Sequence, residues 1–322
     1  MDSTNSIYDT FPTVSNVAHI SPESDDILRK IFTNDLLALS PRKFAHGGDG
    51  LAEVVLTGDN ALYKGMLKAK RYDKEYMAYI VDRTLGFYRV PFISPRNITV
   101  LNSVVQDCHH TCQWKNIGTG EMRNSTDGVF PTILMQYIDG MQTMEIKYFS
   151  SCFDEEGLYN PDGIFIYSIK QDMETGDVHK INYRRCELDL VMELSDLAIF
   201  DFLILNHDRW KTELLRNTFS STSYQDRLVY IDNGNSFSRS KASPNHLNFC
   251  AFRDSTVARL VNITKNEKKL SAATMLNQQL LSPTQSTKSL KKYFGIVDEQ
   301  LKKFSDHLTS CLAKFPTNKV LL

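Results

Sequence analysis

The chain has 322 residues, 42% of them hydrophobic, which is enough for one large domain or two lobes around a sizeable buried core. Its 37 Lys and Arg residues and 38 Asp and Glu residues leave a formal net charge of −1, and this balance excludes the basic field of a nucleic-acid or membrane-surface binder. No apolar run approaches the roughly 20 residues that a helix needs to span a bilayer.

The first half of the chain is predicted to be rich in strands. A polar extension with a short helix comes first, and then two strands around Gly-rich turns. Next comes a helix whose apolar residues recur at helical spacing, followed by two further strands. In chain order, these elements are predicted at residues 25–37, 52–58, 61–65, 72–86, 96–106 and 129–138.

The second half is predicted to be mainly helical. A turn-rich span over residues 152–184 holds a hairpin, and a long helix follows over residues 187–204. From Val297 to Phe315, apolar residues recur at alternating steps of three and four, which is typical of an amphipathic helix on a core. We therefore expect an α+β fold with a strand-rich N-lobe and a mainly helical C-lobe. The expected divisions are an N-terminal extension, an N-lobe and a C-lobe, at residues 1–40, 41–140 and 141–322.

Cysteines and Asn-X-Ser/Thr triplets favour an oxidising compartment, although the N-terminal residues lack the basic and apolar regions of a signal peptide. We expect a protein of the Golgi lumen or the extracellular space whose signal or anchor is absent from this sequence, with a cytoplasmic protein as the alternative. The candidate glycosylation sites are Asn97, Asn124 and Asn262. The six cysteines are Cys108, Cys112, Cys152, Cys186, Cys250 and Cys311.

The segment CHHTC, residues 108–112, has two interpretations. Its cysteines and histidines are all potential zinc ligands, but zinc sites usually draw a second ligand pair from a distant segment, and no pair with recognisable spacing is present. We favour disulfides over a metal here, and the metal interpretation stays open.

The N-lobe contains a candidate nucleotide site. Glycines let backbone N–H groups approach phosphate, and a lysine on a strand, paired with a glutamate on a helix, can hold it, as in protein kinases. The alternative interpretation is an ordinary hairpin turn with a surface lysine. The strand before Asp139 would then be the hinge whose backbone pairs with adenine, or else a plain buried strand. The candidate nucleotide-binding residues are Gly47, Gly48, Gly50, Lys64, Glu75, Gln136 and Ile138.

The C-lobe contains a sharper signal. In kinases a catalytic-loop aspartate accepts the proton of the substrate hydroxyl, a residue five positions later binds metal, and so does a second aspartate after a strand. Here Asp208 is followed at that position by Glu213, and Asp232 comes directly after the apolar run LVYI. Each motif alone would also fit a helix cap or a turn. Their order, behind a Lys and Glu pair, favours a kinase.

Several motifs resemble those of the atypical secretory-pathway kinases. This family includes the Golgi casein kinase, the proteoglycan xylosylkinase and the Four-jointed cadherin kinase. MELSDLAIFDFLILNHDR and LVYIDNGNSF are similar to its I/LFDYL/FL run, N-x-D-R loop and DNG or DNE metal motif. EYMAYIVDRTLGFYRVP, CAFRDSTVARL and LTSCLAKF resemble three further motifs. The resemblance covers roughly residues 45–100 and 185–320.

The resemblance implies a two-lobed, atypical protein-kinase-like fold that uses ATP and usually Mn²⁺, or Mg²⁺. It implies that Asp208 is catalytic, that Asp232 and Glu213 bind metal, and that Lys64 and Glu75 lie at the phosphates. It also implies a disulfide between the last helix and the CAFRD stretch, Cys250–Cys311. The same hypothesis pairs Cys108 with Cys112 and leaves Cys152 and Cys186 as the third pair.

The sequence also departs from this family. Branches that share Glu213 read D-R-H-H in the catalytic loop, whereas this chain reads Asp208-Arg209-Trp210-Lys211. Those branches have two adjacent cysteines where this chain has the single Cys250. In having one cysteine here, the chain is more similar to the Four-jointed and related Golgi kinases. This mixture of features leaves the acceptor open.

We expect a metal-dependent kinase that phosphorylates a Ser or Thr hydroxyl of a secreted or lumenal protein. The alternatives are a sugar kinase acting on xylose of a proteoglycan linker, and a pseudokinase that binds nucleotide and activates a partner. The expected partners are a secreted protein or a glycan, with no nucleic acid and no membrane span. The oligomeric state does not follow from the sequence.

Overall fold

The computed structural model divides the chain into two compact units, Met1–Tyr72 with Pro91–Asp139, and Asp73–Val90 with Gly140–Leu322. Residues 73–90, inside the expected N-lobe, thus group with the second unit. For some strand residues only the backbone is described. The described residues are 20, 22–32, 36–41, 51–57, 62–68, 71–99, 129–136, 143–148, 150–171, 178–207, 209, 214–216, 228–238, 247–265 and 287–322.

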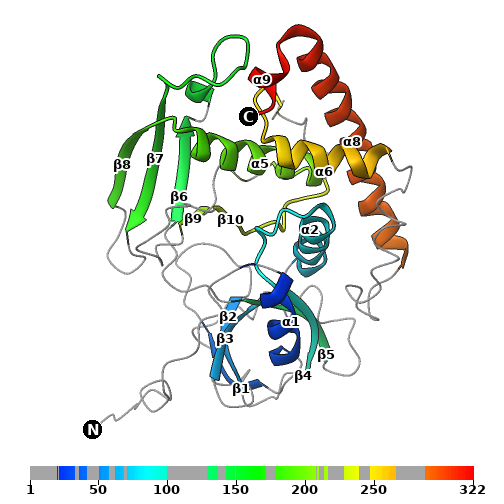
Figure 1. Ribbon diagram of the computed structural model, residues 1–322. Coiled ribbons are helices and arrows are strands. Elements are labelled where there is room, and N and C mark those ends of the chain that lie inside the picture. Colours follow the sequence, from blue (N-terminus) through cyan, green and yellow to red (C-terminus); the bar gives the residue numbers. More distant parts are fainter. Residues whose placement is uncertain are drawn as a thin grey trace. The chain divides into compact units, whose positions relative to one another are not determined.

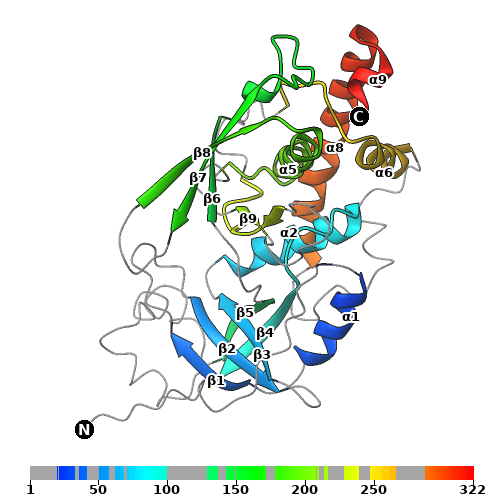
Figure 2. The ribbon, with the colours of Figure 1, turned by 60° about the vertical axis from the view of Figure 1, so that its left-hand side comes forward.

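The first unit contains a five-stranded antiparallel sheet in the order β1-β2-β3-β5-β4, with helix α1 (Pro22–Ile31) beside it (Figure 2). Its buried residues include Leu67, Ile133 and Leu134. The predicted strand pair at residues 52–65 is present as β2 and β3, and the strand after residue 129 as β5. The strand bounds are Leu36–Pro41, Leu51–Thr57, Leu62–Lys68, Ile93–Thr99 and Val129–Gln136 for β1 to β5.

The second unit contains another five-stranded antiparallel sheet, in the order β10-β9-β6-β7-β8. The predicted hairpin within residues 152–184 is formed by β7 and β8. The bounds are Thr143–Tyr148, Ile164–Gln171, Val178–Arg185, Leu214–Arg216 and Leu228–Tyr230 for β6 to β10. A short 3₁₀ helix, η3 (Ser150–Cys152), follows β6.

Helix α5 (Leu188–Ile204) lies between this sheet and α8 (Thr287–Lys314), as the two views show (Figure 1, Figure 2). Nearly all of its residues are buried, which is expected of a helix whose apolar residues are not confined to one face. The other helices of this unit are α2 (Tyr72–Leu85), α6 (Asp254–Lys265) and α9 (Thr317–Val320). Both long helices predicted from periodicity are therefore present, and α8 begins ten residues before the first predicted apolar position. Among the described residues, no helix has the length and apolar character needed to cross a bilayer.

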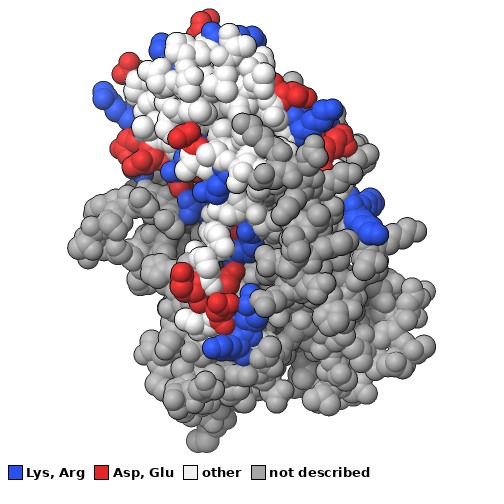
Figure 3. Space-filling view, turned by 45° about the vertical axis from the view of Figure 1, so that its right-hand side comes forward, with Lys and Arg blue, Asp and Glu red and all other residues white. Residues whose placement is uncertain are grey.

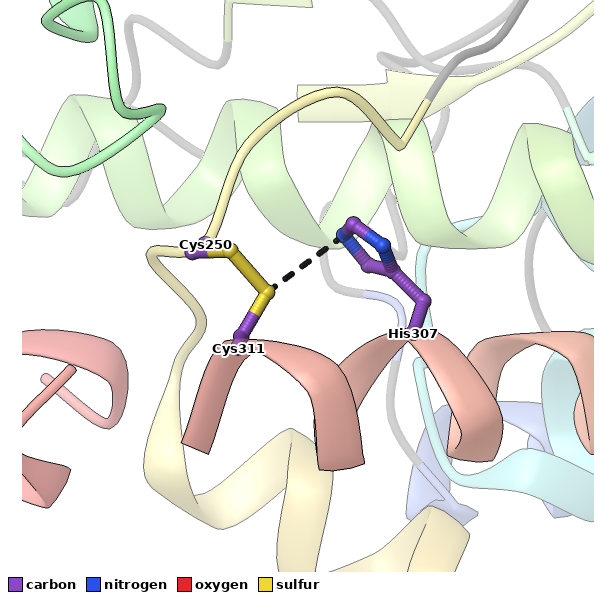
Figure 4. A group of neighbouring side chains, drawn as sticks. All are labelled: Cys250, His307 and Cys311. Carbon is purple, nitrogen blue, oxygen red and sulfur yellow. Dashed lines mark hydrogen bonds between the residues drawn. A yellow bond between two sulfur atoms is a disulfide. The ribbon is translucent and has the colours of Figure 1, made fainter. Parts of the chain in front are cut away.

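Two disulfides join segments of the second unit, Cys152–Cys186 and Cys250–Cys311. Both pairs agree with the sequence hypothesis, whereas Cys108 and Cys112 lie outside the described residues. The second bond ties the start of the CAFRD stretch to α8 (Figure 4). Beside it, His307 Nε2 donates a hydrogen bond to the Phe249 carbonyl at 2.8 Å and lies 3.6 Å from the Cys311 sulfur.

Of the three candidate glycosylation sites, one has a described side chain. Asn262 has an exposed side chain on α6. For Asn97 only the backbone, in β4, is described, and Asn124 is outside the described residues. On the face shown in Figure 3, described Lys and Arg residues lie among Asp and Glu residues, in agreement with the near-zero net charge.

Candidate functional site

The end of α5 places the segment that contains the predicted catalytic loop. Leu205 ends the helix in the left-handed conformation, with φ 51°, and the next N–H, of Asn206, returns to the carbonyl of Asp201 at 2.9 Å. This is a helix C-terminal motif with a non-glycine residue in the left-handed position. A second bond, from the Phe237 N–H to the Ile204 carbonyl at 2.6 Å, ties this helix end to the segment after β10.

Arg209, two residues beyond His207, is buried and forms an ion pair with Asp201 on α5. Its Nε donates to both carboxylate oxygens of Asp201, at 3.1 and 3.0 Å, and its Nη2 donates to one of them at 3.0 Å. The two residues are 5% and 4% exposed. Burial raises the pKa of the Asp201 carboxyl, and the Arg209 guanidinium opposes this rise. The pair joins α5 to the segment that follows it.

The same guanidinium also reaches the segment after β10. Its Nη1 donates to the carbonyl of Ile231, and its Nη2 donates to Oδ1 of Asn233. These two acceptors lie on either side of Asp232 in the chain. Arg209 therefore holds the Ile231 carbonyl before the predicted metal ligand and the Asn233 side chain after it.

Asn233 is the second fixed point beside Asp232. It is fully buried, its backbone N–H donates to Glu75 Oε2 at 2.9 Å, and its side-chain amide donates to the Tyr230 carbonyl at 3.2 Å. Glu75, in the first turn of α2, is also fully buried. Glu75, predicted at the phosphates, thus accepts a hydrogen bond from the residue directly after Asp232, the predicted metal ligand.

Asp232 itself has a left-handed backbone, with φ 54°. Aspartate is one of the few non-glycine residues that adopt this conformation at modest cost. Asp232 is half-buried. The two residues after it, Asn233 and Gly234, are buried, and so is strand β10 before it. The surrounding bonds of Ile231 and Asn233 hold this conformation in place.

A buried charge network supports β10. Arg89 donates to Glu193 on α5 at 2.6 Å, Arg253 donates to the same carboxylate at 3.0 Å, and the other Glu193 oxygen accepts the Leu228 N–H at 3.4 Å. The Arg89 carbonyl accepts the Tyr230 N–H at 2.9 Å. Burial raises the pKa of Glu193, while the two arginines oppose the rise. The strand that leads to Asp232 is therefore fixed from α5 and from the segment after α2.

The predicted nucleotide-site residues are described unevenly. The Gln136 N–H donates to the Phe92 carbonyl at 2.8 Å, and its side-chain oxygen accepts the Phe92 N–H at 3.2 Å, so this backbone donor is already used within the first unit. Lys64 pairs with Val55 in the β2–β3 ladder, and only its backbone is described. The predicted residues outside the described part are Gly47, Gly48, Gly50, Ile138, Asp208 and Glu213.

Sequence reasoning assigned no role to Asp201, Arg209 or Asn233. A signal was present, because Asp201 is one of a few acidic residues on a largely apolar helix, and buried charges need a partner. The nearby arginine of the NHDR motif was the obvious candidate for that partner.

Comparison with known proteins adds three findings. A family profile described as "Golgi casein kinase, C-terminal, Fam20" matches residues 167–320. The human protein "Extracellular serine/threonine protein kinase FAM20C" is 23% identical over 235 residues, and this match spans 63% of the chain but 37% of the human protein.

Among solved structures, a hydra Fam20 structure with sugar has a TM-score of 0.61 and 17% identity, covering 97% of this chain and 96% of that one. A structure of the Golgi casein kinase with Mn/ADP bound has a TM-score of 0.58 and 16% identity, covering 94% of this chain and 80% of that one. These likenesses confirm the predicted α+β kinase-like fold. The motif resemblance is confirmed as well: residues 167–320 match the Fam20 family profile, and the chain is similar in sequence to the human kinase and in fold to Fam20 structures.

Proposed function

We propose that this protein is a metal-dependent kinase that transfers the γ-phosphoryl group of ATP to a hydroxyl, with Ser or Thr of a secreted protein as the acceptor. The observation that carries the proposal is the arrangement around Asp232, a half-buried residue that lies between two residues fixed by Arg209 and Glu75. Fixed carboxylates that hold a cation on phosphate are what phosphoryl transfer requires, because positioning and charge neutralisation supply most of its catalysis.

The donor chemistry of this site fits a hard divalent cation. Asp232 offers carboxylate oxygens, the ligands that Mg²⁺ and Mn²⁺ prefer. We assign Glu213 as the second carboxylate ligand. When bound, the cation would neutralise charge on the phosphates. Glu75 contributes by holding the Asn233 backbone, since one of its oxygens already accepts that N–H.

The chain's own residues would act as follows. Asp208 accepts a hydrogen bond from the acceptor hydroxyl, orients it and takes its proton as the new P–O bond to the γ-phosphorus forms, while the bond from that phosphorus to the bridging oxygen breaks and ADP leaves. Lys64 and the glycines at 47, 48 and 50 hold the nucleotide phosphates through positive charge and backbone N–H groups. The adenine lies against Gln136, the last residue of β5, and Ile138. Among the relatives, the human kinase acts on serine and threonine and one Golgi casein kinase structure holds Mn/ADP, which supports this assignment.

A sugar hydroxyl is the second candidate acceptor. It is favoured by the hydra Fam20 structure, which was determined with a sugar. We propose the lumen of the secretory pathway as the compartment for either acceptor, because the two disulfides need an oxidising environment.

One assay separates these candidates. The protein is incubated with γ-labelled ATP and Mn²⁺ and offered a casein-like protein, cadherin domains and a xylose-containing tetrasaccharide side by side. The proposal predicts label on serine or threonine of a protein acceptor. Label on the tetrasaccharide alone would establish the sugar kinase, and label on none, with nucleotide binding retained, would establish the pseudokinase. Asp306→Ala, at an exposed position on α8, serves as the variant that leaves transfer unchanged.

A further inference from the structure

All three guanidinium nitrogens of Arg209 donate hydrogen bonds, and these bonds join its own segment to α5 and to the segment after β10. Asp201 on α5 accepts from Nε and Nη2, the Ile231 carbonyl accepts from Nη1, and the Asn233 side chain accepts from Nη2. Two of these acceptors flank Asp232. The arginine is also joined through the peptide bond to Asp208. One side chain thus links the two aspartates that the proposed function requires.

A contribution to folding stability does not by itself explain why a buried ion pair of this kind is present. Replacing such pairs with apolar residues of similar volume is often neutral or stabilising, because desolvation opposes the attraction of the charges. The planar guanidinium fork does impose a geometry, since it fixes several acceptors at once in one plane. The arrangement of acceptors around Arg209 therefore indicates a role in positioning.

The same unit contains a second buried pair for comparison. Arg83 on α2 donates to Asp82, and its guanidinium lies over the rings of Tyr79 and Tyr88. Asp82 also accepts the N–H groups of Arg89 and Val90, at 2.9 and 3.2 Å. This pair is as buried as the Arg209 pair, and the contacts just named lie on α2 and in the turn after it.

We propose that Arg209 is a positioning residue that sets the Asp232 carboxylate for the cation, with Asp201 as the counter-charge that orients the guanidinium. The inference rests on the proposed function in that it takes Asp232 to be a metal ligand. Lysine cannot replace this arginine, because its ammonium is a point charge that cannot reach the Asp201 carboxylate, the Ile231 carbonyl and Asn233 in one plane.

The test measures Mn²⁺ affinity directly. Free Mn²⁺ is followed by electron paramagnetic resonance as the full chain is titrated in the presence of ADP, for the wild type, Arg209→Lys and Arg83→Lys. Removing a residue that orients a metal ligand typically weakens metal binding roughly 10- to 100-fold. We expect a loss of about that size in Arg209→Lys and an unchanged dissociation constant in Arg83→Lys, at comparable losses of melting temperature.

Asp201→Asn is the second variant, for the case that Arg209→Lys does not fold. It keeps an acceptor of the same shape beside Arg209 and should weaken Mn²⁺ binding in the same direction. Wild-type affinity in either folded Arg209→Lys or Asp201→Asn would overturn the inference, and so would an equal loss in Arg83→Lys. A wild-type protein that binds Mn²⁺ with ADP but transfers no phosphate would refute the proposed function alone. A wild-type protein that binds no Mn²⁺ would refute both.

Discussion

Glu75 accepts a hydrogen bond from the backbone N–H of Asn233 at 2.9 Å, across 158 positions of the sequence. Both residues are fully buried, so the bond has no competition from water. It connects the first turn of α2 to the residue directly after Asp232. Through this bond, the first turn of α2 helps to hold the segment that contains the predicted metal ligand.

Removing the Glu75 acceptor should destabilise the second unit. A buried N–H left without a partner costs about 1–3 kcal/mol, so we expect at least that loss in Glu75→Ala. Glu75→Gln keeps an oxygen in reach of the Asn233 N–H and should lose clearly less. Urea unfolding of the three proteins measures both effects. Equal free energies of unfolding in Ala and Gln variants would show that the bond contributes nothing.

Periodicity and turn chemistry were sufficient to predict the local elements of this fold. Helices α2 and α5 follow from apolar spacing within one segment, and the β2–β3 pair from two short runs around a turn. The pairing Cys250–Cys311 came from motif resemblance, since spacing alone does not fix disulfide connectivity.

The long-range contacts of the site could not be predicted in the same way. Nothing local to Glu75 indicates that its partner is a backbone N–H of Asn233, and a left-handed Asp232 is compatible with many turns. The grouping of α2 with the second unit depends on tertiary packing. The Asp201–Arg209 pair did leave a clue in the sequence, as an acidic residue near the end of a largely apolar helix and an arginine shortly after that end.

Because the hydroxyl of Tyr230 is buried, we predict that the folded protein loses stability at alkaline pH. Among the described residues this hydroxyl has no hydrogen-bond partner, and burial raises its pKa well above the ordinary value. In the unfolded chain the tyrosine hydroxyl ionises near pH 10, whereas in the folded protein it stays neutral to higher pH. The contribution of Tyr230 to the free energy of unfolding is therefore fully present below about pH 10 and falls as the pH rises above it. Tyr230→Phe should abolish this component of the fall and cost little stability at pH 7.

Tyr159→Phe is the matched comparison for Tyr230→Phe. The Tyr159 hydroxyl donates to the Cys186 carbonyl at 2.7 Å, so its removal should cost about 1 kcal/mol at pH 7. Urea unfolding between pH 7 and 11 measures both variants. A loss at pH 7 as large in Tyr230→Phe as in Tyr159→Phe would mean that the buried hydroxyl has a partner.

The two disulfides should stabilise the second unit to similar extents. They span 34 and 61 residues, and the chain-entropy model gives about 4 kcal/mol for each, with about 0.5 kcal/mol more for the longer loop. Replacing each pair by alanines and unfolding the variants in urea tests this. Mapping of unreduced peptides provides the control, and a free Cys250 thiol in the wild type would contradict the pairing.

Glu213 should set the choice of metal. Most kinases have a neutral asparagine five residues after the catalytic aspartate, whereas this chain has Glu213, which we propose as a second carboxylate at the site of Asp232. Manganese tolerates irregular oxygen sites better than magnesium, which demands a near-ideal octahedron. We expect wild type to prefer Mn²⁺ strongly and Glu213→Asn to lose this preference before it loses activity. Indistinguishable curves of rate against metal concentration would place Glu213 away from the cation.

The central claim is that the Asp232 carboxylate and Asp208 together carry out phosphoryl transfer, and one measurement tests it most directly. Transfer from γ-labelled ATP is measured for Asp208→Ala and for Asp232→Asn, the latter chosen because asparagine also adopts the left-handed backbone of Asp232. The account predicts that each variant loses several orders of magnitude in rate while its melting temperature stays close to that of the wild type, with Asp306→Ala unchanged in both. Transfer at a rate comparable to the wild type in either aspartate variant would contradict it.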